Sequence, residues 1–167
     1  MTRVCLLGDD DLALRQTLLS HETAREALQT YTLQEPFHNA VCVETVSLGA
    51  AVALLNDLQW YLVRYVETAL IQEPSVSATE WLSRDLATAI RDDEVNPADS
   101  GQYLKVYGKI PPADAVASDD APGGVITAPK LIEPMYVTRT EGSLPEYDLR
   151  DVEETVVLRV SEDEFSR

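Results

Sequence analysis

The sequence has few basic residues, few cysteines and no long uncharged apolar segment. Its 13 basic residues include only three lysines, Lys105, Lys109 and Lys130, and face 29 acidic residues. Because no basic stripe stands out, a nucleic-acid-binding protein is disfavoured. No run of about 18 apolar residues is free of charge, so we predict neither a transmembrane helix nor a membrane partner.

The two cysteines, Cys5 and Cys42, each lie in an apolar run, and there is no CxxC pair. The amino terminus leads into only four apolar residues after Arg3, so we predict no signal peptide. We expect a cytoplasmic protein with both thiols free. A zinc site built from these cysteines with His21 and His38 would match no known ligand spacing, so buried thiols are expected instead.

The acidic residues are scattered along the chain and do not form one tail. The chain has 167 residues, is 45% hydrophobic and carries a net charge of −16. This composition is typical of proteins from extreme halophiles, because molar salt screens the repulsion of a negative surface. The alternative is an acidic mesophilic protein that presents an acidic surface to a partner.

Strand-like patterns occur at both ends of the chain. They cover residues 4–7, 41–46, 103–110, 131–138 and 155–160. We predict one α+β domain over residues 1–167, with a small, mostly antiparallel sheet built from the first strand and the last three. Residues 111–130 are rich in Pro, Gly and Asp, and we expect a flexible insertion there.

The helical signals lie in the first 90 residues. Apolar residues from Leu48 to Ala69 recur at spacings of 3 and 4, and Ser47 is a credible N-cap, so we predict one long amphipathic helix that packs on the sheet. A competing interpretation breaks this helix near residues 56–57 and makes residues 60–66 a strand. A capping box at residues 77–80 predicts a shorter helix. Residues 21–28 predict another, and residues 11–19 fit either helix or strand.

Three segments resemble a haloarchaeal family of unknown function. They are residues 47–58, residues 60–64 and residues 133–139. The resemblance covers most of the chain apart from the 111–130 insertion. It implies a halophilic source and no transferable activity.

One face of the predicted long helix lies opposite its apolar seam. At about 100° per residue, Asp57, Trp60, Arg64 and Glu67 share this face. Trp60 and Arg64 are four residues apart and can stack, and Arg64 can pair with either acid. We predict a surface for a ligand or a partner, including a second copy of the chain, because large exposed aromatic residues mark interfaces. The alternative is a helix buried on both sides, with Trp60 in the core.

Three aspartates, Asp9, Asp10 and Asp11, follow the first predicted strand directly. Carboxylates at the end of a strand can bind Mg²⁺ through oxygen. They form a candidate metal site for a small metal-assisted enzyme. The alternative is an exposed acidic turn, which this composition produces often by chance.

Adding Asp57 and Lys109 to these aspartates resembles the residue set of a response-regulator receiver domain. Such a domain needs its central Asp at the end of a buried strand, whereas Asp57 lies within the helical pattern. It also needs strands and helices that alternate in a doubly wound sheet. The sequence therefore disfavours a receiver-like phosphoacceptor.

Three arginines in the β-rich end, Arg139, Arg150 and Arg159, are candidates for an anion site. Arginines of this kind more often pair with nearby acids. The chain has no P-loop, GxGxxG, GxSxG or HExxH motif. Its function is therefore unknown from sequence, and we favour a non-enzymatic interaction or small-ligand-binding protein without a cofactor.

Overall fold

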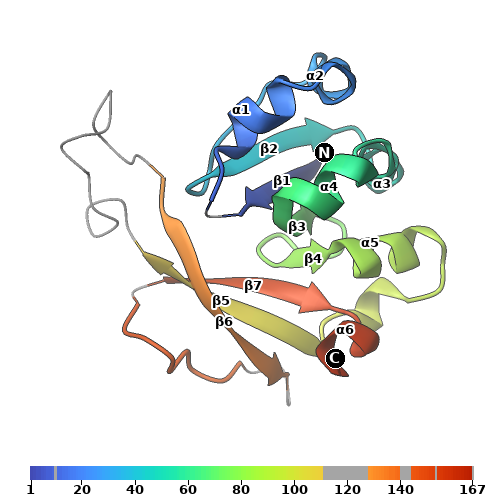
Figure 1. Cartoon of the computed structure of the whole chain (residues 1–167). Helices are drawn as coiled ribbons and strands as arrows, with labels where there is room; N and C mark the ends of the chain where they lie inside the picture. The colour runs from blue at the N-terminus through green and yellow to red at the C-terminus, as the bar shows by residue number, and fades with distance from the viewer. Residues whose placement is uncertain (10, 111–127, 140–143, 153, 167) are drawn as a thin grey trace.

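The computed structural model describes residues 1–9, 11–110, 128–139, 144–152 and 154–166. Among these residues, seven strands form one sheet in the order β2-β1-β3-β4-β7-β5-β6 (Figure 1). Neighbouring strands are antiparallel except for β4 and β7, which run parallel. The strands are β1 (Thr2–Gly8), β2 (Ala40–Thr45), β3 (Val66–Gln72), β4 (Trp81–Ser83), β5 (Tyr103–Ile110), β6 (Lys130–Thr138) and β7 (Glu154–Val160).

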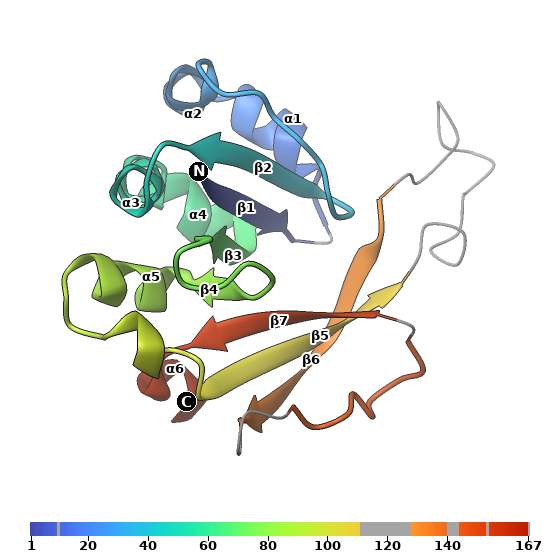
Figure 2. The same ribbon diagram turned by 180° about the vertical axis from the view of Figure 1, so that it is seen from behind.

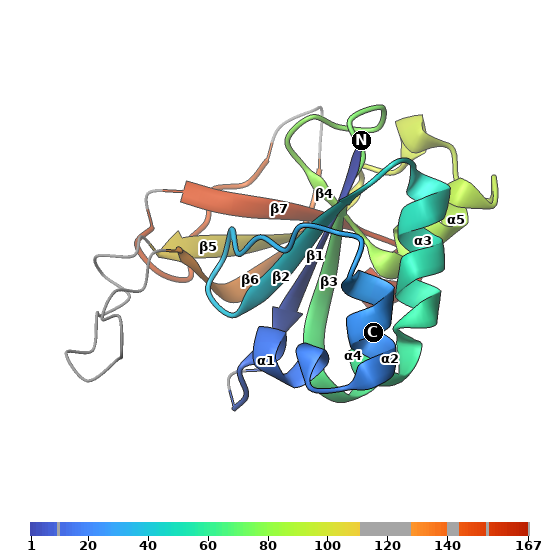
Figure 3. The same ribbon diagram turned by 90° about the horizontal axis from the view of Figure 1, so that it is seen from above.

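Five short helices cover one face of the β2-β1-β3-β4 half of the sheet, as the view from above shows (Figure 3). They are α1 (Leu14–Leu19), α2 (Glu22–Leu28), α3 (Leu48–Asp57), α4 (Gln59–Tyr65) and α5 (Arg84–Arg91). A 3₁₀ turn, η1 (Pro97–Asp99), follows α5, and α6 (Glu162–Ser166) follows β7. None of the helices in the described ranges is long and apolar enough to span a membrane.

Both faces of strand β1 are buried, and its side chains alternate between two cores. Val4 and Leu6 pack toward the helices. Cys5 and Leu7 pack on the opposite face, in a second core that includes Tyr107 of β5 and residues of β7. The β7-β5-β6 half crosses the first half at a steep angle (Figures 2 and 3), which lets the twisted sheet bury part of its second face against itself.

The predicted long helix is wrong, and with it the predicted fold of a small antiparallel sheet against such a helix. The helix begins where expected, because the Ser47 hydroxyl accepts a hydrogen bond from the Ala50 N–H at 3.1 Å. It is interrupted at Leu58 (φ −95°, ψ 6°), resumes as α4, and ends at Tyr65. The chain then becomes β3, where Ala69 lies opposite Leu6 of β1. An apolar residue fits the buried side of a helix as well as it fits a buried strand. Residues 66–72 form a strand here because they pair with β1. The competing interpretation placed a break nearby but is also wrong for residues 60–65, which are helical.

The predicted helix from Ser77 begins later than expected. The Ser77 hydroxyl accepts hydrogen bonds from the N–H groups of Thr79 and Glu80, at 3.3 and 3.0 Å, but caps no helix. The next residues form β4, and α5 starts after Ser83, whose hydroxyl accepts from the Leu86 N–H at 3.1 Å. The pairing of β4 with β3 and β7 makes residues 81–83 a strand and moves the start of the helix past them.

The predicted strands agree with the structure. The five predicted strands are confirmed as β1, β2, β5, β6 and β7, within one or two residues at each end. Residues 14–19 and 22–28 are two separate helices, which answers the question left open for residues 11–19. Most of the predicted insertion, residues 111–127, lies outside the described residues.

Candidate functional site

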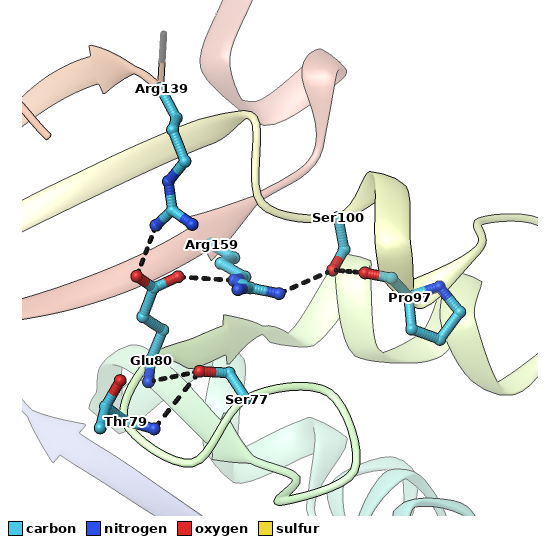
Figure 4. A network of polar contacts seen from close by, with 7 residues as sticks. All are labelled: Ser77, Thr79, Glu80, Pro97, Ser100, Arg139 and Arg159. Carbon is cyan, nitrogen blue, oxygen red and sulfur yellow. Dashed lines mark hydrogen bonds and ion pairs between the residues drawn. The ribbon is translucent and has the colours of Figure 1, made fainter. Parts of the chain in front are cut away.

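Two arginines and one glutamate that are far apart in sequence meet near the ends of β4, β7 and β6, three strands of the sheet (Figure 4). Arg159 of β7 donates from Nε to Glu80 Oε1 at 2.7 Å. Arg139, directly after β6, donates from Nη2 to the other Glu80 oxygen. The three side chains are only 12–22% exposed, so this cluster is a partly buried ion-pair network.

The strand register places these three residues. Glu80 immediately precedes β4, whose Leu82 lies opposite Arg159 in the parallel β4–β7 pair. Arg139 continues the β5–β6 pairing, because its N–H donates to the Gln102 carbonyl at 2.9 Å. The cluster therefore depends on long-range strand pairing and not on a local motif.

Short loops support the cluster on two sides. Arg159 Nη1 donates to the Ser100 hydroxyl at 3.1 Å, and that hydroxyl donates to the Pro97 carbonyl at 2.6 Å. On the other side, the hydrogen bond from Glu80 N–H to Ser77 holds the loop before β4 (Figure 4). These contacts fix the positions of the Arg159 guanidinium and the Glu80 backbone.

The cluster carries a local excess of positive charge within an acidic chain. Two guanidinium groups share one carboxylate. Arg139 Nε is also buried and has no hydrogen-bond partner in the described part of the chain. A buried N–H without a partner is uncommon in native proteins and calls for a specific explanation, such as a bound water or ion.

An open hollow of about 550 Å³ lies beside the two arginines. Arg139 and Arg159 line it together with residues of η1 and the following loop, including Asp99, Gly101 and Gln102. A Cβ atom at Gly101 would lie 3.3 Å from Arg159 Cζ and 3.4 Å from Arg139 Nη1. Glycine at this position therefore lets the backbone approach both guanidinium groups closely.

The structure brings together two of the three candidate arginines, each of the three pairs with an acid, and the anion site stays a prediction. Arg139 and Arg159 converge, whereas Arg150 lies apart and pairs with Glu133 at 3.7 Å on an exposed surface. The acid that joins the first two is Glu80, which is 59 and 79 residues away from them. Sequence analysis assigned Glu80 to a capping box, and no local signal marks it as an ion-pair partner.

The predicted stacking of Trp60 and Arg64 is present on α4. Arg64 Cζ lies 3.7 Å from the centroid of the Trp60 ring, and Arg64 Nη1 donates to the Trp60 carbonyl at 2.9 Å. Trp60 is 50% exposed, so it is not a core residue. His21 lies against it, and with Tyr61 and Tyr65 these rings form one aromatic cluster.

The other two residues of that predicted face are placed differently. Asp57 is the exposed last residue of α3, and Glu67 is exposed on β3. Arg64 forms no ion pair with either acid; all three residues lie in the described part of the chain. The four residues therefore do not share one helical face, because the helix ends at Tyr65.

The aspartate cluster after β1 lies in a turn that Asn39 organises. Asn39 has a positive φ of 54°, and its amide donates to the carbonyls of Asp9 and Leu12 at 2.9 Å each. Asp11 is exposed, and Asp10 lies outside the described residues. Among the residues that are described, no group of three or more His, Cys, Asp or Glu side chains is placed to hold a metal ion. The proposed Mg²⁺ site stays a prediction.

The receiver-like arrangement is not formed. The sheet is mostly antiparallel, whereas a receiver needs a doubly wound parallel sheet. Lys109 lies on β5 and pairs with Glu154 at 3.1 Å, and Asp57 ends a helix. The imagined zinc set is also split: both cysteines lie in the second core, and His21 lies in the aromatic cluster with α4.

Comparison with known proteins identifies a family and no activity. No curated protein and no solved structure matches the chain. Residues 2–109 match a family described as "Family of unknown function (DUF5804)". This range includes Glu80 and Gly101 but ends before Arg139 and Arg159. The matched range is well over half of the chain, which therefore belongs to the Family of unknown function (DUF5804).

Proposed function

We propose that this protein is a non-enzymatic binding protein whose ligand is a small anion with a carboxylate or phosphate group. The site is the hollow beside Glu80, Arg139 and Arg159. The observation that carries the proposal is the buried Arg139 Nε, which has no partner among the described residues although two guanidinium groups already share one carboxylate. Planar guanidinium groups bind carboxylate and phosphate oxygens through paired, charge-assisted hydrogen bonds.

The groups around the hollow favour binding over catalysis. Ser100, the hydroxyl that contacts Arg159, already donates its proton to the Pro97 carbonyl. Neither histidine lines the hollow, and Asp99, which does, makes no hydrogen bond to this hydroxyl in the described part of the chain. We therefore assign the arginines a role in ligand recognition.

Titration calorimetry with inorganic phosphate and with succinate tests the proposal. Each charge-assisted hydrogen bond contributes about 1.5–3 kcal/mol, so Arg139→Gln should weaken binding about 10-fold or more. Asp99→Asn should tighten binding, because it removes a negative charge from the rim of the hollow. Arg150→Gln is the matched control, since Arg150 lies on an exposed surface with Glu133. The salt concentration must be held constant, because chloride competes as an anion.

An NMR measurement checks the same site without relying on affinity. The Nε–H resonance of Arg139 should shift on addition of phosphate, while that of Arg150 should stay in place. Equal heats for the wild type and Arg139→Gln, with an unmoved Arg139 resonance, would exclude this hollow as the site.

A second candidate function is partner binding through α4, including self-association into a homo-oligomer. Trp60 and Val63 are 50% and 69% exposed on this helix, which is unusual for large apolar side chains. Trp60→Ala should shift the elution volume in molar KCl toward a smaller species and leave the far-UV circular dichroism spectrum unchanged. An unchanged elution volume would remove this candidate.

We also propose that the chain works in a salt-rich cytoplasm, as its 29 acidic and 13 basic residues suggest. A metal-assisted activity at Asp9 and Asp11 has no geometric support among the described residues. Titration with Mg²⁺ tests it directly, and the absence of both heat and thermal shift would eliminate it.

A further inference from the structure

Cys5 and Cys42 lie directly opposite each other on the antiparallel strands β1 and β2. Two observations show that this pair is of the non-hydrogen-bonded type. Cys42 exchanges both of its backbone hydrogen bonds with Gln34, on the side away from β1, at 2.7 and 2.9 Å. Three positions along β1, Gly8 N–H donates to the carbonyl of its opposite residue Asn39 at 2.9 Å. Since the two types alternate along an antiparallel pair, the Cys5–Cys42 position lacks such bonds.

This pairing suits a disulfide. Residues at a non-hydrogen-bonded position have Cα atoms about 4.5 Å apart, and their side chains point to the same face of the sheet. Disulfides span Cα separations of about 4.4–6.8 Å. The typical separation at such a position therefore falls within the range that a disulfide spans, and both thiols are free in this structure.

The surroundings make the two sulfur atoms chemically different. Arg3 Nη2 lies 3.8 Å from Cys42 Sγ, and Arg3 is held against the Trp81 ring at 5.5 Å. The hydrogen bond from Cys5 lowers the pKa of Cys42 to about 7, with a further contribution from the Arg3 charge and with burial opposing it. The same hydrogen bond and burial raise the pKa of Cys5. Cys42 is therefore the better nucleophile, and Cys5 keeps its proton.

We infer that Cys5 and Cys42 form a redox pair that a hydroperoxide converts into a cross-strand disulfide. The Cys42 thiolate attacks one peroxide oxygen, the O–O bond breaks, and the leaving oxygen takes a proton to become water or an alcohol. Cys42 is then a sulfenic acid. The Cys5 sulfur attacks the Cys42 sulfur, the S–O bond breaks, and the hydroxyl leaves as water with the Cys5 proton. Two electrons pass from the thiols to the peroxide.

The position of β2 explains how an oxidant reaches buried sulfur. Both cysteines are 0% exposed, but β2 is an edge strand of the sheet. On the outer side of β2, an isolated bridge to Gln34 takes the place of a neighbouring strand. Such an edge opens locally more easily than a central strand, because fewer contacts hold it. Disulfide formation would tie β2 to β1 and close the chain segment that contains α1 and α2. We therefore expect oxidation to raise the unfolding temperature, since a closed loop restricts the unfolded chain.

Hydrogen peroxide applied to the full chain tests this inference. After oxidation and denaturation in iodoacetamide, the intact mass should show the loss of two hydrogen atoms and no alkylation, and dithiothreitol should restore two alkylatable thiols. Cys5→Ser should stop at a Cys42 sulfenic acid that dimedone captures, and Cys42→Ser should not react. Arg3→Gln should slow the reaction several-fold, while Arg15→Gln, in an exposed pair with Glu35, should not.

Several outcomes would overturn the inference. They are two alkylated cysteines after peroxide treatment, a disulfide between two chains, or oxidation of Cys42 to a sulfonic acid while Cys5 stays alkylatable. The circular dichroism spectrum of each serine variant separates a folding defect from a chemical one. None of these measurements depends on the anion site.

Discussion

The two halves of the sheet differ in how completely their strands are buried. In the β2-β1-β3-β4 half, both faces of β1 are buried, and β1 has six buried residues out of seven. In the β7-β5-β6 half, β6 has only two buried residues out of nine, and arginines from this half reach Glu80 at the border between the halves. Burial on both faces leaves no room for a ligand, whereas the partly covered half can support a hollow lined with charge. We conclude that the first half supplies stability and the border supplies the candidate site.

The largest expected effect comes from the core of the first half. Leu55 is fully buried on α3, so Leu55→Ala should lower the free energy of unfolding by about 2–5 kcal/mol. Leu131→Ala on the partly covered strand β6 should cost only about 1 kcal/mol. Chemical denaturation at one salt concentration measures both. Equal losses would contradict the division of roles between the halves.

Removing the shared carboxylate should have the next largest effect. Glu80→Gln keeps the shape of the side chain but leaves two partly buried guanidinium groups without a counter-charge. We expect a loss of about 2–3 kcal/mol, somewhat below the cost of breaking a fully buried pair. Phosphate should restore more stability to this variant than to the wild type if the hollow binds anions. A variant as stable as the wild type would show that the cluster contributes little.

Salt should stabilise both halves of the chain, because each carries more acidic than basic residues. Residues 1–91 contain 12 acidic and 6 basic residues, and residues 92–167 contain 17 and 7. Raising KCl from about 0.1 M to 1 M shortens the Debye length from about 10 to 3 Å, which screens surface repulsion. The unfolding temperature should rise by several degrees, and an uncharged osmolyte at equal osmolality should act less. The stability lost in Glu80→Gln should shrink in high salt.

The smallest expected effect concerns Glu73, at the end of the first half. Burial pushes its pKa upward, but hydrogen bonds from the Thr2 hydroxyl, at 2.5 Å, and from Ser75 outweigh it, so the pKa is lowered from 4.5. A lowered pKa stabilises the fold above pH 4.5, and this contribution disappears as pH falls through the folded-state value. Glu73→Gln should cost about 0.5–1 kcal/mol at pH 7, because the group is only partly buried. Thermal unfolding of both proteins should converge at low pH, and a constant difference would contradict this explanation.

Sequence patterns predicted elements whose signals are local. Alternating residues marked β5, and Ser47 marked the start of α3, because each depends on near neighbours alone. The patterns failed where one signal fits two structures. The apolar residues of β3 continue the helical spacing of α3 and α4, and Trp81 follows a sound capping box although it begins a strand.

The candidate site was predictable only in part for the same reason. The exposed Trp60 and its partner Arg64 lie four positions apart on one helix, and sequence spacing was enough to suggest their contact. Glu80 joins Arg139 and Arg159 across 59 and 79 residues, and no spacing rule links residues so far apart. The Cys5–Cys42 pair depends likewise on the register of β1 and β2.

By itself, the sequence determined the acidic composition of the chain, five of the strands and the start of α3, because composition and nearest neighbours are sufficient for these. Only the tertiary structure decided where α4 ends, which serine caps α5, which carboxylate neutralises the two arginines and that the thiols face each other. These outcomes depend on pairing between strands that are distant in sequence. That pairing contributes stability only once the sheet has assembled.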